Sequence, residues 1–114
     1  TSDEWKKAYR GSDGRIYPWG NVFSTELCNT AESGFFDTTP VTRYERSRSQ
    51  IGCFDLIGNV EEFTSTRTPE GRIVVLGGSW CMSCELYGLP VLHRLVRDEF
   101  FSNEQGFRCA RDAH

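Results

Sequence analysis

The sequence predicts a loop-rich α+β domain with one short helix and two strands that could pair. Three observations support this: a single helical period at the N-terminus, one β-branched run near residue 75, and a stretch from Val22 to Arg48 without a period of either kind. Frequent glycines and aromatic residues agree with this class. At 114 residues, the chain is expected to form one domain, residues 1–114, that buries roughly two-thirds of its unfolded surface.

The first expected element is a helix that begins after Thr1. Thr1 and Glu4 have the spacing of a capping box, and Trp5, Ala8 and Tyr9 would share one helix face. A glycine at position 11 is expected to end the helix. The loop-rich layer that follows is expected to be held together by buried aromatic side chains, namely Phe23, Phe35, Phe36 and Tyr44.

The sheet is expected to contain two strands near the C-terminus. Residues 72–76 form a β-branched run that predicts a buried strand, and the glycines at 77 and 78 then allow a turn or a close approach. Trp80 follows as a large anchor for the core. Residues 107–111 alternate apolar and charged side chains, which predicts a half-buried strand. If these strands pair, the 25 residues between Trp80 and Gly106 are held at both ends, and we expect function there. The glycines would equally fit a simple tight turn.

Charge and composition exclude several classes of function. The net charge is −3 and the 13 basic residues are scattered apart from Arg43, Arg46 and Arg48, so nucleic-acid binding is not expected. No apolar run approaches the ~20 residues of a membrane span, so we expect a soluble protein, compatible with secretion or surface display. Five cysteines cannot all pair within the chain, which leaves the compartment open. Cys81 and Cys84 form a C-x-x-C without a second pair, so structural zinc is not expected.

Several motifs recur in one order along the chain. They are the segment from Glu4 to Asn21 with its DGRIYPWGN run, CNTAESG at 28–34, TPV at 39–41, GNVEEFT at 58–64, GGSW at 77–80 and GFR at 106–108. In this combination the chain resembles the formylglycine-generating-enzyme (sulfatase-modifying factor) family. The resemblance covers nearly the whole chain but only the C-terminal half of the family's usual domain. It implies a C-type-lectin-like α+β fold in which a small antiparallel sheet supports long loops.

The family that the chain resembles includes copper-dependent oxidases that convert a cysteine of sulfatases to formylglycine. Those enzymes hold copper with two cysteines that have four residues between them. Here Cys81 and Cys84 have only two residues between them, which departs from the family's pattern. Two thiolates could still bind Cu(I), so this oxidase, with Cys81 and Cys84 as catalytic residues, is the alternative function. A pair of small semi-buried thiols is the simpler interpretation.

The same family includes non-catalytic binding proteins, among them the variable proteins of diversity-generating retroelements. Their mutagenised segment lies between a Gly-Gly-Ser-Trp-like motif and a C-terminal Gly-Phe-Arg, and residues 81–105 occupy that place here. An apolar, aromatic-containing segment on a rigid frame is typical of a surface that binds a protein or cell-surface ligand. The sequence therefore favours a ligand-binding display module without catalysis. The candidate binding residues are Cys81, Ser83, Cys84, Leu86, Tyr87, Leu89, Leu92, His93, Arg94, Arg97, Phe100 and Phe101.

Two further interpretations of residues 81–105 stay open. Adenine-directed mutagenesis of Asn codons excludes five amino-acid types, Glu, Lys, Met, Gln and Trp. Five of the 25 residues are of these types, against 18 of 114 in the chain, so variation across the whole segment is not supported. Individual positions remain compatible with it. The apolar residues could instead complete the core or pack against a partner, the missing half of the domain, because patches this apolar are uncommon on monomers.

The resemblance also implies structural calcium, since family members often bind Ca²⁺ through loop oxygens. Two stretches match: oxygen ligands on irregular loops suit the six-to-eight coordination of calcium. The asparagines of both stretches would equally serve as turn caps. One expected site combines Asn29, the Thr30 carbonyl, Asp37 and a carbonyl such as that of Thr39, and the other combines Asn59, the Val60 carbonyl and Glu62.

Overall fold

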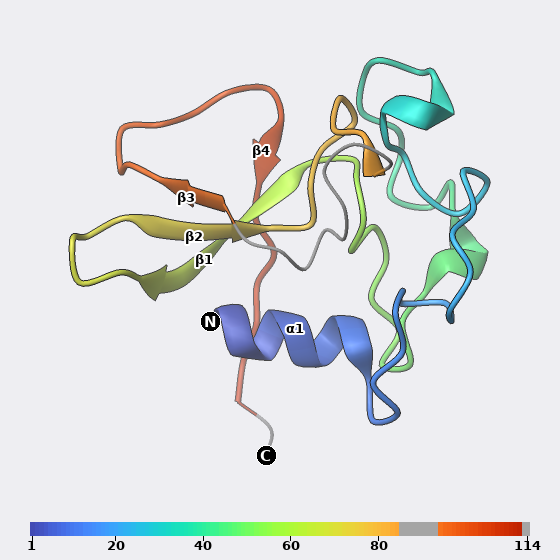
Figure 1. Ribbon diagram of the computed structural model, residues 1–114, viewed down its shortest axis with the longest axis horizontal. Helices are drawn as coiled ribbons and strands as arrows, with labels where there is room; N and C mark the ends of the chain where they lie inside the picture. The colour runs from blue at the N-terminus through green and yellow to red at the C-terminus, as the bar shows by residue number, and fades with distance from the viewer. Residues whose placement is uncertain (85–93, 113–114) are drawn as a thin grey trace.

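The computed structural model describes residues 1–84 and 94–112. Within them, a four-stranded sheet packs beside one α-helix, and loops form the other side of the molecule (Figure 1). The chain is therefore of the expected α+β class, with a small sheet and few helices. The elements are α1 (Ser2–Arg10), two 3₁₀ helices (Ala31–Ser33 and Glu45–Ser47), β1 (Glu61–Arg67), β2 (Ile73–Leu76), β3 (Arg94–Val96) and β4 (Gln105–Gly106).

The N-terminal helix forms as its sequence predicts. The backbone N–H of Glu4 donates to the Thr1 hydroxyl at 3.2 Å, which completes the capping box, and the N–H of Gly11 caps the other end. Trp5 and Tyr9 are 6% and 0% exposed, so one face of the helix is buried. The predicted cap, end and buried face are all confirmed.

The sheet has the strand order β3-β2-β1-β4. β2 pairs antiparallel with both β1 and β3, whereas β4 runs parallel to β1 through the pairs Glu61 with Gln105 and Glu62 with Gly106. The sheet is therefore mixed, and the prediction of a wholly antiparallel sheet is wrong. After β2 the backbone turns at Gly77 (φ 97°), where a Cβ would lie 3.2 Å from the Leu56 carbonyl oxygen.

The predicted strand at residues 107–111 is absent: these residues are described and none of them is in a strand. Both edges of β2 are already taken by β1 and β3, so no edge remains for a further partner. Phe107 is 78% exposed, and the Arg108 side chain turns back to form an ion pair with Glu62. Pairing with the sheet occurs earlier than predicted, through β4, and joins β1 instead of β2.

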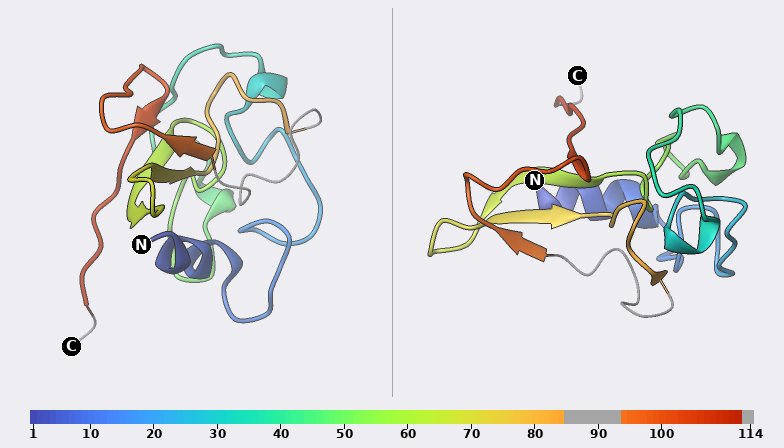
Figure 2. Two further views of the ribbon diagram at one scale, coloured as in Figure 1. Left: turned by 60° about the vertical axis from the view of Figure 1, so that its left-hand side comes forward. Right: turned by 90° about the horizontal axis from the view of Figure 1, so that it is seen from above.

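The core lies where α1 meets the sheet and the loop that precedes β1, as the two views of Figure 2 show for the helix and strands. The loop residues Leu56 and Ile57 are 2% and 1% exposed, and the buried side chains of β2 pack in the same core. Cys28 joins this cluster and is 1% exposed. The described part of the chain contains no helix long and apolar enough to cross a membrane.

Only part of the predicted aromatic layer is buried. Tyr44 is 6% exposed and Phe23 packs against the core, as expected. Phe35 and Phe36 are 45% and 68% exposed, so their predicted role as buried plugs is wrong. The Arg43 guanidinium lies 4.3 Å from the Phe35 ring, so this aromatic side chain stacks with a cation at the surface instead. Trp80, expected as a core anchor, is half-buried and lies outside the core cluster.

Candidate functional site

A polar junction, buried except for its arginine, joins the two ends of the chain to the sheet. We define this buried polar junction as Trp5, Asn29, Asn59, Glu62 and Arg108, of which the Arg108 side chain is 33% exposed. The Glu62 carboxylate is 4% exposed and accepts from the Trp5 indole N–H at 2.7 Å and from Arg108 Nε at 2.7 Å. A second contact between the Glu62 and Arg108 side chains makes the ion pair bidentate. The Gly-Phe-Arg motif at residues 106–108 therefore connects the C-terminal segment to β1 through Arg108.

The two asparagines of the junction cross-link three loops. Asn29 Nδ2 donates to the Asp37 carbonyl at 2.8 Å and to Asn59 Oδ1 at 3.3 Å, and Asn59 Nδ2 donates to the Thr39 carbonyl at 3.2 Å. The side chains are 0% and 6% exposed. They thus perform the loop-capping role that the sequence left open. They also bring the two predicted calcium sets side by side. Asn29 Oδ1 has no partner among the described residues.

A cavity of about 430 Å³ gathers the second predicted calcium set, since Asn59, Val60 and Glu62 all line it. Asp55 lines it too, and the sequence analysis missed this residue. Asp55 is 9% exposed, and its Oδ2 atom finds no partner in the described part of the chain. Burial raises the Asp55 pKa to about 6, while Arg108 acts to lower it and Glu62 to raise it. A lone acid inside the apolar run from Phe54 to Ile57 was the available signal.

The side-chain oxygens of the junction and its cavity are of the chemical type that a hard cation such as calcium prefers. Asn29 Oδ1 and Asp55 Oδ2 are buried acceptors without donors, which is a costly state that a calcium ion would relieve. Glu62 is less available, because both of its oxygens already accept hydrogen bonds. The Asp37 carboxylate is exposed and accepts from the N–H of Thr38 at 2.7 Å. No group of three His, Cys, Asp or Glu side chains suited to a metal occurs in residues 1–84 and 94–112, so amide and carbonyl oxygens would have to complete the coordination.

The two cysteines of the alternative function lie in different surroundings. The Cys84 side chain packs against the core, and burial, with a smaller effect of Glu32, raises the pKa of its thiol to about 11. Cys81 is exposed, and its thiol donates to Glu104 Oε1 at 2.6 Å. Burial and this hydrogen bond raise the Cys81 pKa. The exposed Cys81 and the core-packed Cys84 therefore lie in different surroundings, and both would have to lose their protons on binding copper.

Of the other candidate binding residues, several meet at one place on the surface. Arg94, Arg97 and Phe100 line a groove of about 360 Å³ beside β3. Four of its members, Arg72, Leu95, Val96 and Glu99, were not among the predicted binding residues, and they carry no motif of their own. We call this the β3 groove, formed by Arg72 and residues of 94–100. The Arg94 guanidinium lies 5.1 Å from the Phe100 ring and forms an ion pair with Glu61.

The remaining candidates fall into three groups. Phe101 is 86% exposed beside the groove, so its side chain is available to a ligand. Ser83 is half-buried and donates to Glu32 Oε1 at 2.7 Å, which suits a structural role for its hydroxyl. Five candidates lie outside the described residues: Leu86, Tyr87, Leu89, Leu92 and His93.

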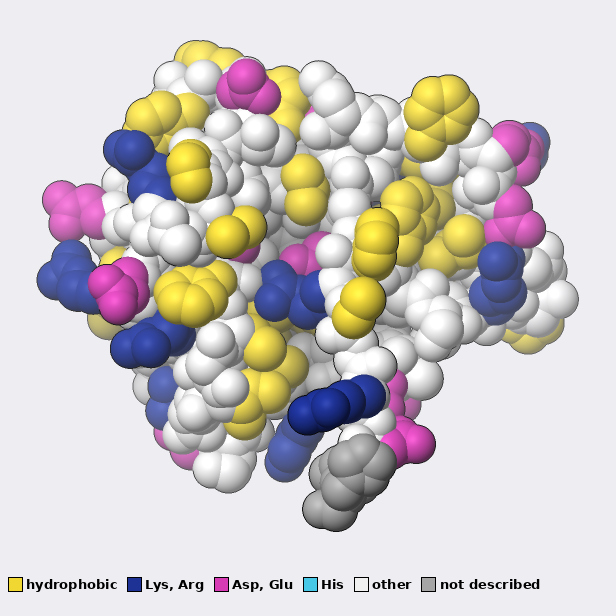
Figure 3. Space-filling model, turned by 180° about the vertical axis from the view of Figure 1, so that it is seen from behind, with side chains coloured by type: hydrophobic (Ala, Val, Ile, Leu, Met, Phe, Trp, Pro, Cys, Tyr) yellow, Lys and Arg dark blue, Asp and Glu magenta, His cyan; other side chains and the backbone are white. Residues whose placement is uncertain are grey.

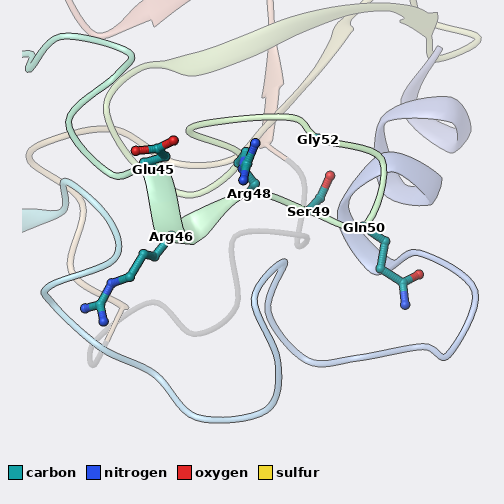
Figure 4. A pocket seen from close by; sticks show the side chains of 6 residues that line it. All are labelled: Glu45, Arg46, Arg48, Ser49, Gln50 and Gly52. Carbon is teal, nitrogen blue, oxygen red and sulfur yellow. The ribbon is translucent and has the colours of Figure 1, made fainter.

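Other surfaces are less organised. Seen from behind, hydrophobic side chains occur in several separate groups with Lys and Arg side chains between them (Figure 3). A further cavity of about 390 Å³ is lined by residues of 45–52. Its two arginines, Arg46 and Arg48, point in different directions, and Gln50 points away from both (Figure 4). These side chains do not converge on a common ligand.

Comparison with known proteins reveals consistent similarities. The family model for the sulfatase-modifying factor enzyme 1-like domain matches residues 1–113. The chain itself is 34% identical to "Inactive C-alpha-formylglycine-generating enzyme 2" of Mus musculus and 31% identical to the Bos taurus protein of the same name. Both alignments contain 131 positions and cover 99% of the chain. The chain spans 42% and 43% of the lengths of these two relatives. A crystal structure of CarF superposes with a TM-score of 0.71 at 22% identity, covering 92% of this chain and 43% of CarF, which shows a shared fold.

Proposed function

The chain belongs to the sulfatase-modifying factor enzyme 1-like family, and on that premise we propose that it is a non-catalytic ligand-binding module whose β3 groove and neighbouring residues contact a protein or cell-surface ligand. One observation carries the proposal: the basic and aromatic side chains of residues 94–101 stand exposed together, while of the two cysteines of the alternative oxidase Cys84 packs against the core and Cys81 is exposed. We further propose that the fold is of the C-type-lectin-like variant.

The names of the two relatives support the absence of catalysis. Both mammalian proteins are called inactive, although they belong to a family named for enzymes. Family membership and fold alone do not decide activity, so the argument depends on the site. Here the cysteine spacing departs from the family's pattern, and Cys81 and Cys84 lie in different surroundings.

The more specific form of the proposal is a variable protein of a diversity-generating retroelement, with residues 81–105 as the diversified segment. Its support is the position of that segment between Gly-Gly-Ser-Trp and Gly-Phe-Arg, and the exposure of Arg97 and Phe101 within it. The test is deep sequencing of this locus across a natural population of its source. Substitutions clustered between Trp80 and Gly106, with constant flanks, are the expected result. A segment as constant as its flanks would rule out diversification.

Copper binding separates the module from the oxidase. Titration of the reduced protein with Cu(I) in competition with a chelator is expected to show no site that depends on Cys81 or Cys84. Tight binding that is lost in both Cys81→Ser and Cys84→Ser would instead support the alternative, a copper-dependent oxidase that generates formylglycine. Cys109→Ser is the matched control, because Cys109 is an exposed thiol remote in sequence from the pair.

We also propose that calcium acts as a structural cofactor at the buried polar junction and its cavity. The ligands would come from the predicted sets, Asn29, Thr30, Asp37, Asn59, Val60 and Glu62, with Asp55 in addition. The two buried oxygens without partners, Asn29 Oδ1 and Asp55 Oδ2, support the proposal. When bound, the ion would neutralise buried carboxylate charge and tie the loops to β1.

A further inference from the structure

β3 forms one edge of the sheet. In the order β3-β2-β1-β4, β2 is its only neighbour among the strands of the described residues. No backbone hydrogen bond from the described part of the chain reaches the opposite edge of Arg94–Val96. An open strand edge presents N–H and C=O groups in the spacing that an extended peptide requires, and addition of a strand to such an edge is a recurrent mode of peptide recognition.

The β3 groove places apolar surface directly beside this edge. Leu95 is 38% exposed on the strand itself, and Phe100 is 40% exposed on the turn that follows. The Arg94 guanidinium over the Phe100 ring holds that aromatic side chain at the groove wall. Phe101 adds a side chain that is 86% exposed. Leu95 pairs with the core residue Val74, so it faces the opposite side of the sheet from Arg94 and the Phe100 ring. Apolar side chains on the Phe100 face of an added strand would therefore find a partner here.

The charges of the β3 groove select among peptides. Arg72 and Arg97 line the groove and form no ion pair with any described residue. Arg94 is neutralised by Glu61, and Glu99 is the one acid among the described lining residues. The groove is therefore positive although the whole chain carries a net charge of −3. A partner with acidic side chains is favoured over a basic one, because like charges would oppose binding.

From the open edge, the apolar walls and the free arginines, we propose that the β3 groove binds an extended acidic peptide, in which carboxylate side chains alternate with apolar ones, as a strand added to β3. The inference deepens the proposed ligand-binding function and rests on it. A nucleic acid is a poorer match, since two free arginines make a small phosphate-binding surface on an acidic protein and an open strand edge has no role in it.

The test uses fluorescein-labelled peptides and fluorescence anisotropy with the full chain. An eight-residue peptide of alternating glutamate and valine is the probe. Three control peptides each change one feature of this probe. The first has lysine in place of every glutamate, and the second has all glutamates followed by all valines. The third has the original sequence with every second backbone amide methylated, so that one edge of the strand cannot donate hydrogen bonds. We expect each of the three to bind about tenfold or more weakly, since they lose charge complementarity, alternation and backbone donors respectively.

Variants of the protein locate the site. Arg97→Glu and Arg72→Glu are each expected to weaken binding of the glutamate–valine peptide by roughly three- to tenfold, with a loss that shrinks at high salt. Arg111→Glu, on the exposed C-terminal segment, is the matched control and should change the affinity less than twofold. Both groove positions are at the surface, so folding is expected to persist, and circular dichroism checks it.

Three outcomes would overturn the inference. If the methylated peptide bound with the same affinity as the unmethylated glutamate–valine peptide, binding would depend on charge and not on strand addition. Tighter binding of an eight-nucleotide oligo(dT) than of the peptide would indicate a nucleic-acid surface. No binding of the alternating peptide, or the same affinity in Arg97→Glu and Arg72→Glu, would exclude the β3 groove as its site. None of these outcomes affects the population sequencing or the copper titration, so failure here is distinguishable from failure of the proposed function.

Discussion

The buried polar junction and the β3 groove use similar side chains in opposite ways. In the junction, Arg108 is held by a carboxylate that is 4% exposed, and the Glu62 side chain also accepts from the Trp5 indole. In the groove, Arg97 and Phe101 are exposed, and Arg97 forms no ion pair with a described residue. Buried polar groups must be paired because an orphaned charge is costly, whereas exposed ones are free to serve a ligand. The first region therefore determines the architecture and the second can change without altering it.

The largest expected effect is the loss of the central carboxylate of the junction. Glu62→Ala removes the acceptor of the Trp5 indole N–H and leaves the Arg108 guanidinium without its ion-pair partner. An unsatisfied buried donor such as the Trp5 indole N–H costs about 1–3 kcal/mol, and losing hydrogen bonds to a charged group such as the part-exposed Arg108 guanidinium costs about 1.5–3 kcal/mol, so together about 3–5 kcal/mol. We expect a decrease of that size in the free energy of unfolding, measured by urea titration. Glu70→Ala, in an exposed turn, is the control and should cost less than about 0.5 kcal/mol. A loss for Glu62→Ala as small as the control would show that the junction does not stabilise the fold.

A second test addresses the close approach of two backbones at the junction. In Gly58→Ala, the added Cβ would meet the Asn29 carbonyl oxygen at 2.1 Å, at a φ of +73° that disfavours side chains. Steric shift and backbone strain together are expected to cost about 2–4 kcal/mol in urea unfolding. Gly34→Ala has a similar φ of +79° but no atom within 4 Å, so only the strain of about 1 kcal/mol should remain. Equal losses in the two variants would contradict the close packing of residues 29 and 58.

The substitution Asp55→Asn should raise the stability of the protein when calcium is removed and lower it, relative to the original protein, when calcium is saturating. In Asp55→Asn, the amide replaces a buried carboxylate whose Oδ2 has no described partner, so thermal unfolding in chelator is expected to shift upward, by about 1–2 kcal/mol of stability. Asparagine also tolerates the Asp55 φ of 53°. In saturating Ca²⁺, the original protein should gain about 2–3 kcal/mol and the variant much less.

The control for this calcium test is Asp112→Asn, at an exposed position near the C-terminus, which should behave as the original protein in both conditions. A melting temperature of the original protein that is identical in Ca²⁺ and in chelator would exclude a calcium site at the junction. A gain that survives in Asp55→Asn would place the ion on other residues.

Local signals in the sequence were sufficient for the elements that depend on neighbouring residues. The Thr1 and Glu4 capping box, the glycine after the helix and the β-branched run of β2 all act within a few residues, and each prediction is confirmed. The family motifs were likewise readable, because they recur as short strings, and the family match over residues 1–113 agrees with them.

Features that depend on distant residues were not predictable in the same way. Phe107 and Arg108 alternate as a strand would, but their conformation follows from Glu62, 46 residues away in the sequence. Asp55 resembles a turn residue until its burial and its place in the cavity are known. Arg72 and Leu95 belong to the β3 groove because β2 and β3 are neighbours, and no local pattern reports that pairing. Strand register and long-range ion pairs were thus the missing information.

The smallest expected effect on stability belongs to the exposed segment, and it sharpens the contrast with the junction. Phe101 is 86% exposed, so Phe101→Ser removes little buried surface and should change the free energy of unfolding by less than about 0.5 kcal/mol. Leu76→Ala, at a residue 1% exposed in β2, should cost about 2–5 kcal/mol in the same urea titration. A loss that small for Phe101→Ser would show that Phe101 is not part of the core, which leaves its side chain available to a ligand beside the groove. A loss above about 1.5 kcal/mol for Phe101→Ser would instead show that this segment packs as core, which is the interpretation that competes with a binding surface.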